Sequence, residues 1–149
     1  MSTIIGQAFD AQEALKALID GLSAFDDYVV ELGTPQTWRD KQAWVASAVD
    51  DDLTEDASEL LLYSNPRLIV CVAVTQYAGD TGWTPLRSAL ETACAAFEGA
   101  LQADPTVSGT CSACFPRSLT VQEADFPDSN ELRLVAMYTL QADQYPVGA

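Results

Sequence analysis

Hydrophobic residues recur at helical spacing in two segments of the chain. In the first, residues 11–22, one face carries six apolar residues: Ala11, Ala14, Leu15, Leu18, Ile19 and Leu22. Asp10 precedes this face, and Glu13 follows three residues later, which is a capping-box pattern. We therefore expect a helix over residues 11–22 that is capped by Asp10.

The second helical segment covers residues 84–102. Its apolar stripe consists of Leu86, Leu90, Cys94, Phe97 and Leu101. Thr84 is the expected N-cap, and Pro85 is expected at the first helical position, where its missing N–H costs nothing. Asp104-Pro105 then marks the end of the helix.

Extended patterns surround the second helix. Residues 67–77 form a nearly continuous apolar run, typical of a central strand covered on both faces. Residues 131–143 alternate between apolar and polar positions, which predicts a strand with one buried face. Shorter strands are expected at residues 28–32, 110–115 and 119–124. Residues 37–48 match neither period, so we expect a loop there with a short strand near residues 43–48.

These elements predict an α+β fold, with a mixed, mainly antiparallel sheet and two helices packed on one face. A chain of 149 residues with 48% hydrophobic content fits one domain over residues 1–149. An acidic inserted loop is expected at about residues 46–59, with Thr54 capping a short helix through Leu61, and a short tail at residues 144–149. An EF-hand loop begun at Asp50 would require glycine and glutamate where the chain has Glu55 and Leu61, so we expect no metal site in this loop.

The charge is strongly negative, with 22 acids against 7 bases and a formal net charge of −15. Phosphate backbones are gripped by lysine and arginine, so binding of DNA or RNA through charge is not expected. The one nucleic-acid role that suits this charge is a surface past which DNA slides, although solubility alone also accounts for acidity. The longest apolar run, Leu68–Val74, is seven residues. Because about 20 are needed to cross a bilayer, and residues 1–6 lack the pattern of a signal peptide, we expect a soluble protein without a membrane partner.

Candidate chemistry is sparse. The chain has no histidine, which excludes hydrolysis by a histidine-containing triad. Cys111 and Cys114 form a lone C-x-x-C motif. In an extended segment their Cα atoms would lie about 10 Å apart, beyond disulfide reach, so we expect free thiols with no catalytic, cofactor or metal role. Replacing both by serine is expected to leave the fold and assembly largely intact. For each of Trp38, Trp44 and Trp83 taken singly, a position in the core is favoured, whereas at least one of the three is expected at an interface.

A family resemblance rests on residues 67–143. The chain resembles the tail terminator (tail completion) proteins of long-tailed bacteriophages, in which an apolar strand, an amphipathic helix, a helix-ending step and a strand hairpin follow one another. The corresponding segments here are Leu68–Tyr77, Pro85–Ala103, Asp104-Pro105-Thr106-Val107-Ser108-Gly109 and the strands that end before Tyr145. The helix with Leu15, Leu18 and Leu22 also stands where the family has one. Residues 33–66, with Trp38 and Trp44, have no counterpart in the family.

The resemblance implies a structural virion protein that is assembled in the host cytoplasm and is not an enzyme. It implies a homohexameric ring at the head-proximal end of the tail tube, which stops tube polymerisation and joins the tail to the head-tail connector protein. DNA would pass through the lumen without specific binding, and Asp50–Asp52 would line the channel or its rim. The alternatives are a neck or head-completion protein and a non-viral intracellular protein-binding adaptor.

Overall fold

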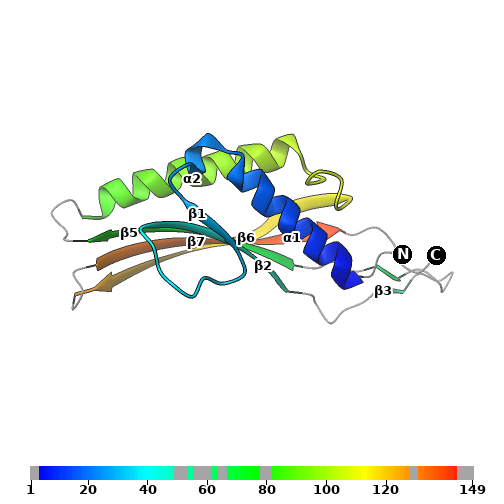
Figure 1. The fold of residues 1–149 in the computed structure, drawn as a ribbon, viewed down its shortest axis with the longest axis horizontal. Coiled ribbons are helices and arrows are strands. Elements are labelled where there is room, and N and C mark those ends of the chain that lie inside the picture. The colour runs from blue at the N-terminus through cyan, green and yellow to red at the C-terminus, as the bar shows by residue number, and fades with distance from the viewer. Residues whose placement is uncertain are drawn as a thin grey trace.

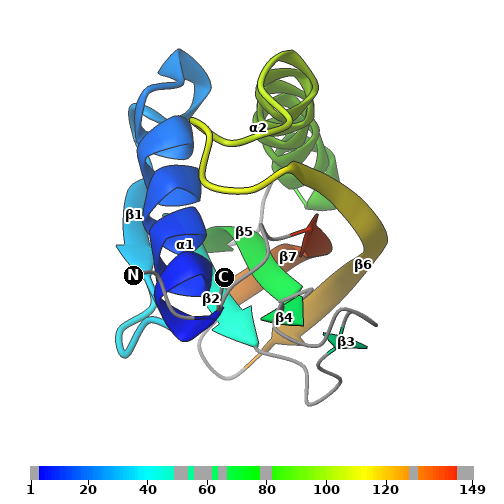
Figure 2. The same cartoon turned by 90° about the vertical axis from the view of Figure 1, so that its right-hand side faces the viewer.

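The computed structural model describes residues 4–48, 54–55, 62–63, 67–77, 82–127 and 131–143. Its elements are helices α1 (Ile4–Asp20) and α2 (Trp83–Ala103), a 3-10 turn (Ser23–Phe25), and strands β1 (Val29–Leu32), β2 (Lys41–Ala48), β3 (Thr54–Glu55), β4 (Leu62–Tyr63), β5 (Arg67–Tyr77), β6 (Ala113–Phe126) and β7 (Glu131–Asp143). Five strands form one sheet in the order β1-β2-β5-β7-β6, and both helices lie on the same face of it (Figures 1 and 2). The predicted α+β architecture is confirmed.

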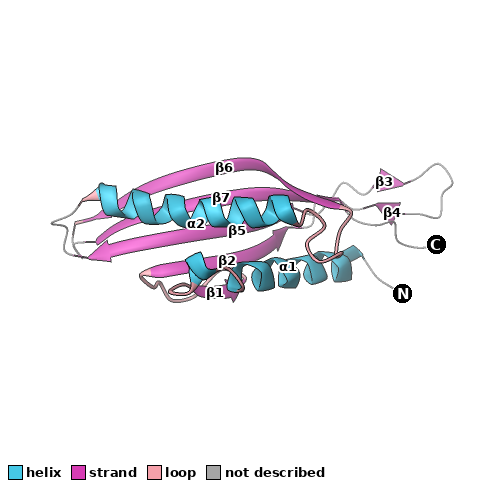
Figure 3. Cartoon of the chain, turned by 90° about the horizontal axis from the view of Figure 1, so that it is seen from above, coloured by secondary structure: helices cyan, strands magenta, loops and turns pink. Residues whose placement is uncertain are grey.

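The sheet is mainly antiparallel, with one parallel pair between β1 and β2. Strand β5 runs through its middle, where Val70 lies between Val45 of β2 and Tyr138 of β7. Both β5 and β7 have the boundaries that their sequence patterns predict. Strand β6 lies at one edge of the sheet and β1 at the other (Figure 3).

The main core lies between the helices and the sheet. Its largest fully buried side chains include Leu15, Ile19, Phe97 and Tyr138. A smaller cluster of Trp44, Cys71 and Ala73 lies on the opposite face of the sheet. Residues 70–74 of β5 are therefore buried on both faces, as their continuous apolar pattern predicts.

The predicted starts of both helices are wrong. Helix α1 begins at Ile4, so Asp10 lies inside the helix and the predicted capping box is absent. The apolar face extends back to Ala8, which is fully buried and makes the longer helix favourable. Gly82, with φ 64°, is the N-cap of α2, which places Thr84 and Pro85 in the first turn. Proline is tolerated there because first-turn N–H groups have no partner within the helix.

Two strand predictions and one predicted helix cap also need correction. Strand β2 spans residues 41–48. The sequence does not reveal its full length, because the polar residue Gln42 is fully buried and interrupts the apolar pattern. The side-chain amide group of Gln42 bonds to the backbone of Thr37 and Arg39. Residues 113–126 form one strand instead of two, with a register shift between Pro116 and Ser118. Thr54 lies in β3 and so caps no helix, while residues 49–53 and 56–61 of the acidic loop fall outside the described residues.

Candidate functional site

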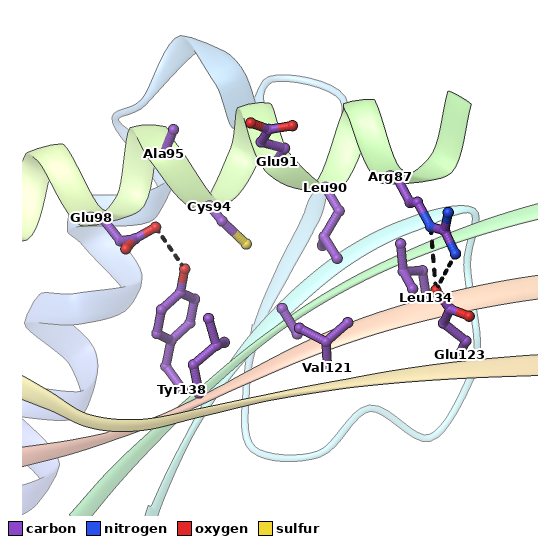
Figure 4. A pocket seen from close by; sticks show the side chains of 12 residues that line it. Arg87, Leu90, Glu91, Cys94, Ala95, Glu98, Val121, Glu123, Leu134 and Tyr138 are labelled. Atoms are coloured by element: carbon purple, nitrogen blue, oxygen red, sulfur yellow. Dashed lines mark hydrogen bonds and ion pairs between the residues drawn. The ribbon is translucent and has the colours of Figure 1, made fainter. Parts of the chain in front are cut away.

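A groove of about 500 Å³ opens between α2 and β6 (Figure 4). Its apolar lining comes from one side of α2 and from β6 and β7: Leu90, Leu119, Val121, Leu134 and Ala136. Its charged residues are Arg87, Glu91 and Glu98 on α2 and Glu123 on β6. The groove thus combines an apolar floor with a mainly acidic rim.

The groove is open because α2 lies over β5 and β7 and leaves β6 uncovered. The register of β6 on β7 places Leu119 and Val121 on the helix-bearing face, opposite Tyr138 and Ala136. Leu119 remains 51% exposed and Val121 53% exposed, although both are large apolar residues on the face that carries the core. No described strand pairs with the outer side of β6, so its backbone groups are available there as well.

Two polar contacts hold the rim in place. At one end, the guanidinium Nη2 of Arg87 lies 2.8 Å from Oε1 of Glu123, so this ion pair connects α2 to β6. At the other end, the hydroxyl of Tyr138 donates to Oε2 of Glu98 over 3.0 Å. Burial raises the pKa of Tyr138, so the hydroxyl stays protonated as a donor.

Cys94 is partly buried, since it packs against the main core, as the predicted stripe on α2 requires, and also lines the groove. Ala93 beside it is buried as well. Burial raises the pKa of the Cys94 thiol, so the nucleophilic thiolate is disfavoured at neutral pH. The groove therefore has the chemistry of a contact surface.

The two other cysteines of interest lie beyond α2. Cys111 belongs to the turn before β6 and Cys114 to the strand itself, and both side chains are buried. A hydrogen bond between their thiols lowers the pKa of Cys111 and raises that of Cys114. The predicted separation assumed that both residues lie in an extended strand, which is not the case, because Cys111 precedes β6 and its N–H bonds to the carbonyl of Thr106. Both are free thiols in this structure.

The helix-ending step at residues 104–109 is a tight turn in the left-handed region. Val107, Ser108 and Gly109 have φ values of 47°, 57° and 75°. The carboxylate of Asp104 accepts the N–H of Ser108 at 2.8 Å and the hydroxyl of Thr106 at 3.1 Å. The side chain of Val107 is fully buried, so the turn attaches the end of α2 to the core.

On the opposite face of the sheet, Trp38 packs edge-on against Trp44, with ring centroids 5.7 Å apart. The guanidinium of Arg133 lies 3.8 Å from the ring of Trp38 and is paired with Glu131 at 2.9 Å. Trp44 is buried, Trp83 is partly buried against the main core, and Trp38 is 45% exposed. Trp38 is therefore the tryptophan with the most surface available to a partner.

Within the described parts of the chain, no cluster of three or more potential metal-ligating side chains occurs. The same residues include no helix that is long and apolar enough to cross a membrane. Asp50–Asp52 lie outside the described residues, so their predicted place in a channel stays a prediction.

Comparison with known proteins gives little further information. No family model and no curated protein matches the chain. Among solved structures, a chain of the virion of a native gene transfer agent particle is similar over 91% of both chains, with 13% sequence identity and a TM-score of 0.34. This TM-score is too low to establish a shared fold, so no functional conclusion follows from the similarity.

Proposed function

We propose that this chain is a structural virion protein, a phage tail terminator. In this role it forms a homohexameric ring at the head-proximal end of the tail tube, stops tube polymerisation and offers a surface to the head-tail connector protein. The proposal makes the chain a component of the tail or neck that is assembled in the host cytoplasm.

The observation that carries the proposal is the exposed apolar edge formed by β6 and its groove. Soluble monomers seldom leave a long, apolar edge strand uncovered, because such an edge pairs with other chains. Strand β1 forms the opposite edge of the same sheet (Figure 3). A contact between unlike edges of successive copies is heterologous, and repetition of such a contact closes into a ring when the rotation permits.

Two further features support this function. The strand, helix, helix-ending step and hairpin of residues 67–143 occur in the order that the family resemblance implies. In addition, a formal net charge of −15 suits a ring through which DNA passes without specific binding. A non-catalytic role is part of the proposal, since a chain without histidine lacks the commonest general base.

Electron microscopy of particles made by a phage that lacks this gene tests the function. A tail terminator is expected to leave tails of uncontrolled, excessive length that do not join heads. Complete tails of normal length beside unjoined heads would instead support a neck or head-completion protein. Normal infectious particles would contradict a structural role.

A further inference from the structure

Helix α1 has an exposed apolar flank that faces the β1 edge of the molecule. Ile5 is 53% exposed and Phe9 48% exposed. Phe9 follows Ile5 by four residues and Gln12 follows it by seven. Residues at these spacings share one side of a helix, so Gln12 lies on the same flank. Its amide donates to the carbonyl of Val45 over 2.7 Å.

The direction of that hydrogen bond orients the flank. The Val45 carbonyl also accepts the N–H of Gly33, which directly follows β1, so this carbonyl points to the β1 side of β2. The flank that carries Gln12 therefore looks outward over the β1 edge. Helix α1 lies towards the β1 edge of the sheet and α2 towards β6 (Figures 2 and 3). The flank with Ile5 and Phe9 and the groove between α2 and β6 consequently lie at opposite sides of one helical layer.

The two surfaces match in length and direction. The flank from Phe9 to Asp20 and the side of α2 from Arg87 to Glu98 each cover three helical turns, about 16 Å. Helices α1 and α2 run in opposite directions along the sheet (Figures 1 and 3). When a second copy is placed beside the first with its helices on the same face, Phe9 falls near Glu98 and Lys16 near Glu91, and Ile5 lies one turn beyond the Glu98 end of the groove.

The charges also match in this arrangement. Lys16 is the cation of the flank and is paired with Asp20 at 2.7 Å. Glu91 lies on the groove side of α2, between Arg87 and Glu98. The antiparallel placement puts Lys16 near Glu91, and Asp20 near Arg87. Because the formal net charge of −15 opposes association of two copies, the contact has to combine apolar area with locally matched charges.

We propose that the flank of α1 formed by Ile5, Phe9 and Lys16 docks into the α2–β6 groove of a second copy of this chain, so that each copy uses both surfaces head to tail. This inference names the subunit contact of the ring and rests on the proposed function for its role in the virion. Phe9 covers Leu119 and Val121, and Lys16 pairs with Glu91. Because the contact repeats in one direction, both surfaces of every copy are occupied only when the ring closes.

Analytical ultracentrifugation of the full-length chain over a concentration series tests the contact. Phe9→Ser and Leu119→Ser are expected to weaken association at least about tenfold each, because both remove a central apolar contact. Lys16→Glu and Glu91→Lys are expected to weaken it several-fold each, and the double variant Lys16→Glu/Glu91→Lys to recover most of the loss. A matched control is Lys16→Glu/Asp10→Lys, which has the same net charge but reverses an exposed acid outside the flank and is expected to show no recovery.

Circular dichroism of each variant confirms that the altered residues, which lie on the surface, leave the monomer folded. A chain that stays monomeric at every concentration, a closed dimer, or rings that are indifferent to Phe9→Ser and Leu119→Ser would overturn the inference. Rings built through some other surface would leave the tail-terminator function standing. Rings built through this contact, in a phage whose tails are normal without the gene, would reject the function and keep the contact.

Discussion

Replacing Asp104 by alanine should destabilise the protein through the left-handed turn that follows α2. The carboxylate accepts the N–H of Ser108 and the hydroxyl of Thr106, and each bond contributes about 1–1.5 kcal/mol net. A negative charge at a helix C-terminus is unfavourable by about 0.3–1 kcal/mol, so its removal offsets part of the loss. The expected net decrease in unfolding free energy is about 1–2.7 kcal/mol.

Urea denaturation followed by circular dichroism measures this effect. With a slope of about 2 kcal/mol per molar urea, the midpoint should fall by about 0.5–1.3 M. Ser108→Gly is the matched control, since Ser108 is exposed and adopts φ 57°, where glycine is relieved of the steric cost of a side chain. That variant should be as stable as the wild type or more stable. An unchanged midpoint for Asp104→Ala, or an equal loss in Ser108→Gly, would refute the role assigned to this turn.

Three further predictions concern other parts of the fold. Burial raises the pKa of Tyr28 from 10.0 to about 12, with smaller contributions from the nearby Cys94 and Asp27. The protonated Tyr28 side chain therefore contributes its full stabilisation below pH 10, and this contribution is lost as the pH rises through about 12. Urea titrations across this pH range should show a weaker pH dependence of stability for Tyr28→Phe than for the wild type. The double variant Cys111→Ser/Cys114→Ser should retain the native circular dichroism spectrum. Its unfolding free energy in urea should fall by about 1–3 kcal/mol, because two hydroxyls replace buried thiols. An unchanged unfolding free energy would contradict this prediction. Trp38→Ala should lower the unfolding free energy by about 1–2 kcal/mol, because the contacts of Trp38 with Trp44 and Arg133 are lost. The fluorescence of the remaining tryptophans should shift to longer wavelength, because Trp44 becomes more exposed to solvent. An unchanged spectrum would show that Trp38 does not shield Trp44 in solution.

The sequence predicts best the elements whose burial pattern is local. Strands β5 and β7 have their predicted limits, because a continuous apolar run and a strict alternation each correspond to one kind of strand environment. Strand β2 is harder to predict, since the polar residue Gln42 is buried and is satisfied by backbone groups of residues 37 and 39 in the preceding turn, which interrupts the apolar pattern of the strand. Helix α1 was predicted too short because Gln7, a polar residue, is buried within its first turns.

The groove could not be predicted from the sequence. Leu119 and Val121 alternate with polar residues, as in any strand with one buried face. Their exposure results from the lateral position of α2 over β5 and β7, which is decided by packing of the whole helical layer. Likewise, the contact between Cys111 and Cys114 depends on where the turn ends and β6 begins, and element boundaries are poorly encoded by local pattern.

Tube assembly in vitro tests the central claim most directly. Tail tube protein from the same phage is polymerised with and without the purified full-length chain, and tube lengths are measured in electron micrographs. The account predicts that tubes formed with the chain are shorter in proportion to the amount added and carry a ring at one end. Tubes whose length distribution does not change, and whose ends carry no ring, would contradict the account.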